Sequence, residues 1–309
     1  MGNMTTGELM RESISRVYRG AKKIPAIRSL MKTAAWRTFR YKVTLLSGPR
    51  SNYHFTRFLR MPSQYEALAG PVLDRVLENG TAKELRIAVI GCSTGAEAYS
   101  ISSVLLNRRP GLAFTIHAAD IEPACVNKAI SAFYTPEEVL SDGIATREFI
   151  SETFDRVNGQ YLVKDTLRAP VHFAVANVLD AGLLDRIGPC DIVYVQQLFI
   201  HLERKQVTEG FKNIHGLMKP GAALFIAGID LDLLVALTRA YNLVPCTFKA
   251  QEINDEIEAV ADGWPYIYWG REPFMTVKKD WQRRYSTIFF RAHGRPDAVT
   301  GNPYHPSIL

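Results

Sequence analysis

The sequence predicts an α/β protein in which a mostly parallel, seven-stranded sheet follows a helical N-terminal cap. Three observations lead to this fold class. From about residue 82, short apolar and β-branched runs alternate with segments of helical periodicity. The residues before that point show helical patterns and almost no strand pattern, and the last two strand-like runs have no clear helix between them. Continuous apolar strands separated by helices are typical of a parallel sheet that is covered on both faces.

Seven runs are expected to form the strands: 86–90, 114–120, 171–177, 191–197, 223–230, 243–249 and 286–292. The last two favour an antiparallel pair at one edge of the sheet. The segment between them is unusually aromatic, with Trp264, Tyr266, Tyr268, Trp269, Phe274 and Trp281. These side chains either line a substrate pocket or pack against the sheet edge.

Four regions are expected along the chain: a basic helical cap (1–50), a linker with one helix (51–81), the main domain (82–295) and a tail (296–309). Pro25 interrupts the cap, which reads as two or three short helices. The linker helix, 62–79, has an apolar face and ends before a glycine, Gly80. That face carries Leu68, Val72, Leu73, Val76 and Leu77.

Composition indicates an ordinary globular protein, with 309 residues of which 47% are hydrophobic. No apolar run reaches the roughly 18 residues of a membrane span, and the N-terminus lacks a secretory signal, so we expect a cytoplasmic location. The four cysteines, Cys92, Cys125, Cys190 and Cys246, form no CxxC pair. Neither a metal site nor a disulfide framework is therefore expected, and buried free thiols are the preferred interpretation.

The net charge of +6 is distributed unevenly. Residues 1–60 hold 13 basic and 2 acidic side chains, so the rest of the chain is acidic overall. A basic segment of this kind attracts an anionic partner, such as an acidic carrier or other acidic protein, or an acidic face of its own main domain. Nucleic acid is a weaker candidate, because no DNA- or RNA-binding signature accompanies the charge.

The strongest local motif is Gly91-Cys92-Ser93-Thr94-Gly95, which joins the first strand to a helical segment. Glycines at such a turn let a ligand approach the backbone, and the following helix offers free N–H groups. The next strand ends at Asp120, near the spacing at which an acidic residue accepts hydrogen bonds from ribose. Asp120 is alternatively a helix N-cap before Pro123.

Two more polar residues extend this candidate nucleotide site. Asn177 lies at the tip of the third strand, where open α/β sheets place ligand contacts, with Asp180 nearby for an adenine amino group. Glu97, in the first turn after the loop, faces a ligand ammonium or simply favours the helix N-terminus.

Six segments occur in a fixed order and spacing: HFTRFLRMPSQYEAL, GCSTGAEAYSISSVLL, AADIEPACVNKAISAFYTPEEV, VHFAVANVLDA, DIVYVQQLFIHLERKQ and FKNIHGLMKPGAALFIAG. Together they cover roughly residues 54 to 227 and resemble the CheR-type protein-glutamate methyltransferases. The resemblance implies a Rossmann-like class I methyltransferase fold with S-adenosylmethionine as cofactor. The cofactor contacts that we expect from motif and resemblance together are Thr56, Arg60, Gly91, Ser93, Gly95, Glu97, Asp120, Ile121, Asn177, Val178 and Gln197.

The chain departs from that family after the fourth strand. Gln197 stands where the family has Asn, His201 where a Tyr lies near the transferred methyl, and His54 replaces another Asn. We expect Arg60 to orient a carboxylate and Gln197 and His201 to face the acceptor. His201 is either a general base or a histidine that bonds backbone.

These departures favour a carboxylate or small-molecule acceptor in biosynthesis, with no metal. Protein glutamate is the alternative acceptor, and cyclisation or aminocarboxypropyl transfer with release of methylthioadenosine is an alternative reaction. Two other classes of protein also fit parts of the sequence. GCSTG also fits the nucleophile elbow of an α/β-hydrolase, with Ser93, Asp230 and His293 in the required order. The remaining class is a non-catalytic, nucleic-acid-binding protein that uses the basic N-terminus.

Overall fold

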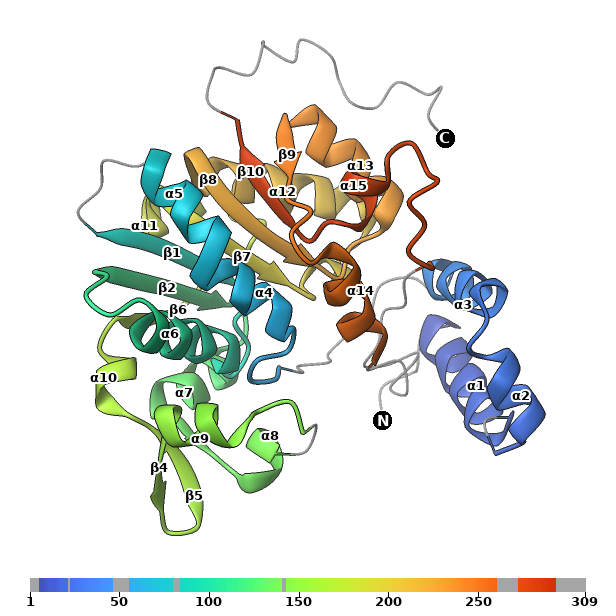
Figure 1. Cartoon of the computed structure of the whole chain (residues 1–309), viewed down its shortest axis with the longest axis horizontal. Helices are drawn as coiled ribbons and strands as arrows, with labels where there is room; N and C mark the ends of the chain where they lie inside the picture. The colour runs from blue at the N-terminus through green and yellow to red at the C-terminus, as the bar shows by residue number, and fades with distance from the viewer. Residues whose placement is uncertain are drawn as a thin grey trace.

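The computed structural model describes residues 6–21, 23–46, 56–79, 84–140, 143–259 and 272–292. Its centre is a seven-stranded sheet in the order β6-β2-β1-β7-β8-β10-β9 (Figure 1). The strands are β1 (Leu85–Ile90), β2 (Phe114–Asp120), β6 (Val171–Val175), β7 (Cys190–Gln196), β8 (Met218–Ala227), β9 (Leu243–Pro245) and β10 (Ile288–Arg291). Each of the seven predicted strands is present, and the fold is the Rossmann-like α/β class that the sequence predicts.

The first five strands along the sheet order, from β6 to β8, pair in parallel, whereas β10 is antiparallel to both β8 and β9. The predicted antiparallel edge pair is therefore correct. The predicted absence of a helix between its strands is wrong, because α14 (Ala250–Ala259) and α15 (Trp281–Tyr285) lie there. Both are short or polar, with Glu and Asp in α14 and two arginines in α15, which weakens their apolar periodicity.

The helices cover both faces of the sheet (Figure 1). Within β1, the buried Val89 belongs to the apolar cluster on the side of α4 to α6, whereas Ala88 and Ile90 belong to the cluster on the side of α11 to α13. Successive strand residues point to opposite faces, so one apolar run serves two cores. The bounds of these covering helices are α4 (Pro62–Ala67), α5 (Leu73–Asn79), α6 (Ala96–Arg108), α7 (Pro123–Ser131), α11 (Leu183–Ile187), α12 (Arg204–Leu217) and α13 (Leu231–Ala240).

The predicted linker helix 62–79 is present but kinked. A π-helical turn (Leu68–Val72) separates α4 from α5, and it contains Gly70, in a non-helical conformation, and Pro71. Proline removes a backbone donor and clashes with the preceding turn, which accounts for the kink. Of the predicted apolar face, Leu68, Val72, Leu73 and Val76 are buried, while Leu77 is exposed. Leu77 therefore does not share the buried face on which its spacing predicts it.

A second, smaller sheet was not expected from the sequence. It has the order β3-β5-β4, with β3 (Phe133–Tyr134), β4 (Phe154–Val157) and β5 (Gln160–Val163). The short helices α8 (Pro136–Leu140), α9 (Arg147–Thr153) and α10 (Asp165–Arg168) accompany it. Strands of two to four residues are too short for a readable period, which is why the pattern did not reveal them.

The N-terminal cap consists of α1 (Thr6–Ala21), α2 (Pro25–Leu30) and α3 (Ala34–Leu46). Three helices with Pro25 at the start of the second agree with the predicted break. Tyr41 of α3 is buried and its hydroxyl accepts a hydrogen bond of 2.9 Å from the backbone N–H of Leu231, at the start of α13. This contact joins the cap to the main sheet domain. In the described residues, no helix is long and apolar enough to cross a membrane.

Candidate cofactor site

The loop after β1 is held in an unusual conformation by its neighbours. The N–H groups of Gly91 and Cys92 both donate to the carbonyl of Ala119 in β2, at 2.8 and 3.0 Å. Gly91 and Ser93 both have positive φ, +79° and +48°. Glycine adopts this region freely, whereas it costs an ordinary residue about 1 kcal/mol or more. The loop is therefore shaped by the sheet and not by local preference.

Gly95 ends the loop and supplies the N-cap of α6, with φ +89°. A Cβ at this position would lie 2.9 Å from Ala129 Cβ and 3.2 Å from the Tyr134 hydroxyl. The Tyr134 hydroxyl in turn donates to the Thr94 carbonyl at 2.6 Å. One side of the loop backbone is thus packed tightly against Ala129 and Tyr134. The glycines leave the opposite side of the backbone free of side chains, which fits a loop that a ligand can approach closely.

Asp120 supports the same loop from the end of β2. Its Oδ2 accepts from Ser93 N at 2.7 Å and its Oδ1 accepts from Glu122 N at 3.0 Å. The alternative role as N-cap is incorrect, since the cap of α7 is Glu122, whose side chain accepts from Ala124 N. A carboxylate oxygen has two acceptor sites, so Asp120 retains capacity for a ribose hydroxyl while it fixes the loop.

Glu97 is the only carboxylate in the first turn of α6, and it is 9% exposed. Burial raises its pKa to about 7, and the nearby Arg60 guanidinium opposes that shift. A buried carboxylate at this pKa gains most from a cationic partner that restores its charge. The ammonium of an amino-acid ligand is such a partner, so the site suits the methionine end of S-adenosylmethionine.

The linker carrying Thr56 and Arg60 is fastened to the same helix. Leu59, with φ +48°, donates its N–H to Ser100 Oγ on α6 at 3.1 Å. Thr56 and Arg60 are both partly buried. The linker therefore lies against the first turns of α6, with Arg60 close enough to Glu97 to oppose the rise of its pKa by burial.

The residues predicted to lie near adenine differ in exposure. Ile121 is 59% exposed, Val178 is buried, and Asn177 Oδ1 accepts from Leu179 N at 2.9 Å. Asp180 forms an ion pair with Arg186 and accepts from Gly182 N, both at 2.9 Å. These contacts give Asp180 a structural role, which weakens its candidacy as an adenine partner.

The segment predicted to face the acceptor follows β7. Gln197 has φ +56° and donates its N–H to the Ala227 carbonyl at 2.8 Å. Leu198 lies against Gly91, at 3.2 Å from a Cβ built there. His201 ends a short 3-10 turn (Phe199–His201) that precedes α12. Gln197 is thus placed beside the cofactor loop, and His201 four residues further along the same segment; His54 lies outside the described residues.

Several buried polar groups near the site were not predicted. Tyr65 and Gln64 of α4, and Tyr194 and Gln196 of β7, are all less than 8% exposed. Burial is the first cause of the raised pKa of Tyr65, and the charge of Glu97 adds to it. One signal in the sequence could have found them, namely polar residues at helix and strand positions whose neighbours are apolar.

The hydrolase interpretation does not agree with the structure. Asp230 is the N-cap of α13, accepting from Leu233 N at 2.7 Å, and the described residues before β1 form only helices. His293 and the aromatic residues Trp264, Tyr266, Tyr268 and Trp269 lie outside the described residues. Phe274 and Trp281 pack on each other, with ring centroids 5.8 Å apart, and Phe274 contacts Tyr285. These two aromatics serve packing.

Comparison with known proteins gives a consistent result. Residues 54–248 match the family model "CheR methyltransferase, SAM binding domain". The "Probable biofilm formation methyltransferase WspC" of Pseudomonas aeruginosa is 31% identical over 67% of this chain and 50% of its own length. "Chemotaxis protein methyltransferase 2" of Vibrio cholerae is 27% identical, over 55% of this chain and 60% of its own. The chain therefore spans about half the length of the first of these relatives.

Proposed function

We propose that this chain, which belongs to the CheR family of S-adenosylmethionine-dependent methyltransferases, methylates side-chain carboxylates on an acidic protein. The family membership supports the cofactor and the transfer of a methyl group. The small-molecule acceptor expected from the sequence finds no support among the relatives, several of which are named chemotaxis protein methyltransferases. Protein glutamate, the alternative acceptor, is therefore preferred.

The observation that carries the proposal is the position of the basic cap. Tyr41 of α3 is hydrogen-bonded to Leu231, four residues after the end of β8. The carboxyl ends of parallel strands form the ligand edge of an open α/β sheet. Figure 1 shows the cap helices on the side toward which the parallel strands point. The described residues of the cap, 6–21 and 23–46, include nine basic and two acidic residues, and this positive charge on the ligand side of the sheet supports an acidic partner.

The site residues divide the task as follows. Glu97 holds the ammonium of the cofactor, Asp120 receives the ribose, and the glycine loop accepts the nucleoside against its backbone. The sulfonium of S-adenosylmethionine supplies an already activated methyl group. Arg60 orients the acceptor carboxylate, and Gln197 and His201 lie on the acceptor side. An ionised carboxylate needs no base, so positioning is the main contribution of the protein.

The proposal predicts base-labile methyl esters on acidic protein segments. The purified chain is incubated with methyl-labelled S-adenosylmethionine and, separately, with glutamate-rich helical peptides or with a metabolite extract. We expect S-adenosylhomocysteine and alkali-released labelled methanol only with the peptides. Label confined to small molecules, or no base-labile ester, would contradict the acceptor assignment.

A charge reversal tests the role of the cap. Arg28, Lys32 and Lys42 are exposed on α2, the turn after it and α3. Changing all three to Glu is expected to raise the KM for an acidic peptide at least about 10-fold, because the cap would then repel the peptide instead of attracting it. Exposed charges act on each other over a Debye length of about 8 Å at physiological ionic strength. The matched control reverses the exposed Arg204, Lys205 and Lys212 of α12. Equal losses in both triple variants would remove the cap from the proposal.

A further inference from the structure

A closed circuit of hydrogen bonds surrounds the point where β7 ends. Gln196 Nε2 donates to Gln64 Oε1 at 3.0 Å, and Gln64 Nε2 donates to Thr287 Oγ1 at 2.7 Å. The Thr287 carbonyl accepts from Ile226 N at 2.8 Å, and the neighbouring Ala227 carbonyl accepts from Gln197 N at 2.8 Å. The circuit thus runs from β7 through α4 and Thr287, the residue before β10, to β8, and returns to β7.

The circuit is buried along its length. Gln64 is 2% exposed, Thr287 2% and Gln196 7%. Polar groups in such surroundings are costly unless they are hydrogen-bonded. Both ends of the Gln64 amide are bonded, whereas Gln196 Oε1 is buried without a hydrogen-bond partner among the described residues, so the bond from Gln196 Nε2 to Gln64 is the one that fixes the Gln196 amide. Gln64 is the central member of the circuit. Its amide oxygen accepts a hydrogen bond from Gln196 in β7, and its amide nitrogen donates one to Thr287, next to β10.

The circuit encloses a strained residue. Gln197 has φ +56°, a left-handed conformation that is unfavourable for a non-glycine residue and persists only where the surroundings impose it. Gly228 is pressed against it, since a Cβ at Gly228 would lie 2.6 Å from Gln197 Cα. The backbone is thus turned sharply between Gln196, the last residue of β7, and Leu198, which packs on Gly91 of the cofactor loop.

Gln64 also links two parts of the site. It lies on α4, four residues after Arg60 of the cofactor linker, whereas Gln196 directly precedes Gln197 and the segment to His201. The Gln196–Gln64 hydrogen bond therefore directly connects the helix that follows the linker with the strand that precedes the acceptor segment. Methyl transfer needs the reacting atoms about 3 to 3.5 Å apart. A small change in the distance between the linker and the acceptor segment is therefore expected to slow the reaction strongly.

We propose that Gln64 is a positioning residue, which through Gln196 holds Gln197 in its left-handed conformation and so aligns the acceptor segment with the cofactor. The inference rests on the proposed methyl transfer. The structural part of this inference is that Gln64 controls the conformation of residues 197–201. It does not depend on which acceptor is methylated.

Two variants open the circuit at different points. Gln64→Leu removes both hydrogen bonds of the amide, and Thr287→Val removes only the one to the hydroxyl. Asn254→Leu is the matched control: Asn254 is 3% exposed and its Nδ2 donates to two backbone carbonyls, those of Ala250 and Tyr285, outside the circuit. All three variants lose buried hydrogen bonds and should be destabilised.

Three measurements on the full chain separate positioning from general destabilisation. We expect Gln64→Leu to slow single-turnover methyl transfer at least about 10-fold, while the Kd for S-adenosylhomocysteine by calorimetry changes less than about 3-fold. Amide hydrogen exchange of the peptide covering 197–201 should accelerate. Thr287→Val should show the same pattern more weakly, and Asn254→Leu should show neither change.

The proposal is overturned if exchange at 197–201 is unchanged in both Gln64→Leu and Thr287→Val, or if Asn254→Leu slows transfer as much. If the wild-type chain methylates no acceptor, the proposed function fails, yet the exchange experiment still decides whether Gln64 controls the segment. If Gln64→Leu does not fold, Thr287→Val supplies the same comparison.

Discussion

Glu97 shows how a single buried group can make cofactor affinity depend on pH. Its pKa, raised to about 7 by burial, means that near neutral pH the carboxyl is partly protonated in the empty protein. An ammonium binds the ionised form, so binding should release a proton at pH 6 and weaken as pH falls below 7. The same raised pKa favours the folded state below about pH 4.3, and that stability is lost as pH rises toward 7.

Glu97→Gln should weaken binding of S-adenosylhomocysteine about 10- to 100-fold at pH 8, corresponding to about 1.5–3 kcal/mol for a charged hydrogen bond. It should also abolish proton release. Calorimetry at pH 6 and 8, in two buffers of different ionisation enthalpy, measures both effects. Proton release that persists in the variant would assign the pH dependence to another group.

Gly95 illustrates a residue chosen by its surroundings. Gly95→Ala adds the cost of a positive φ and a Cβ 2.9 Å from Ala129. We expect a loss of about 2 kcal/mol or more in the free energy of unfolding and at least a 10-fold rise in the cofactor Kd. Gly111→Ala is the control, because Gly111 has φ +86° but nothing within 4 Å of an added Cβ. Equal effects in both would show that the contact is unimportant; urea unfolding and calorimetry provide the comparison.

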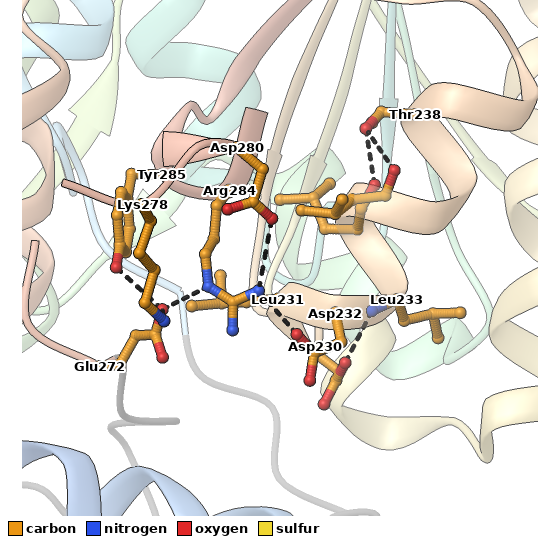
Figure 2. A network of polar contacts seen from close by, with 12 residues as sticks. Asp230, Leu231, Asp232, Leu233, Thr238, Glu272, Lys278, Asp280, Arg284 and Tyr285 are labelled. Atoms are coloured by element: carbon orange, nitrogen blue, oxygen red, sulfur yellow. Dashed lines mark hydrogen bonds and ion pairs between the residues drawn. The ribbon is translucent and has the colours of Figure 1, made fainter. Parts of the chain in front are cut away.

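At the scale of elements, a polar network fastens the segment after residue 271 to α13 and α15 (Figure 2). Glu272, 6% exposed, accepts from Arg284 Nε, from Lys278 Nζ at 2.7 Å and from the Tyr285 hydroxyl at 2.9 Å. Arg284 also pairs with Asp232 of α13 at 2.6 Å. Burial alone would raise the pKa of Glu272, but the hydrogen bonds outweigh it and the pKa lies below its ordinary value.

Glu272→Gln should lower the free energy of unfolding by about 3 kcal/mol, because it leaves a buried guanidinium with less compensation. Since the pKa of Glu272 is lowered, this contribution is complete above about pH 4.3 and disappears as pH falls through the folded value. Glu12→Gln is the control, as its pair with Arg16 on α1 is exposed and should be worth under about 1 kcal/mol. Urea unfolding at pH 7 and pH 3 tests both statements; an unchanged midpoint for Glu272→Gln would contradict them.

At the scale of the whole molecule, Tyr41 joins the basic cap to the sheet domain. Tyr41→Phe removes the acceptor for Leu231 N–H, which should cost about 1 kcal/mol and loosen the cap. Hydrogen exchange in α1 to α3 should accelerate and the KM for an acidic peptide should rise, with the Kd for S-adenosylhomocysteine unchanged. Thr238→Val, which removes a buried hydroxyl within α13 itself, is the control. A cap equally protected in both variants would refute the role of Tyr41.

The sequence by itself determined the seven strands, the antiparallel edge and the glycine loop, because apolar periodicity and turn glycines act over a few residues. It also identified the cofactor family, since six motifs lie in register over roughly residues 54–227, inside the stretch 54–248 of this chain that matches the family model. It assigned Asp120 to the end of β2, where the structure places it.

Only the tertiary structure decided which side chains are buried away from water and which distant residues pair. It buried Glu97, excluded Leu77 from the core, gave Asp120 a second role beneath Ser93, and brought Gln64 to Gln196 across 132 positions of the chain. Burial and pairing between distant residues depend on how the layers stack, and a local pattern carries no record of that. The strained Gln197 is the same case, since its conformation is imposed by β8 and α4 and not by its own preference.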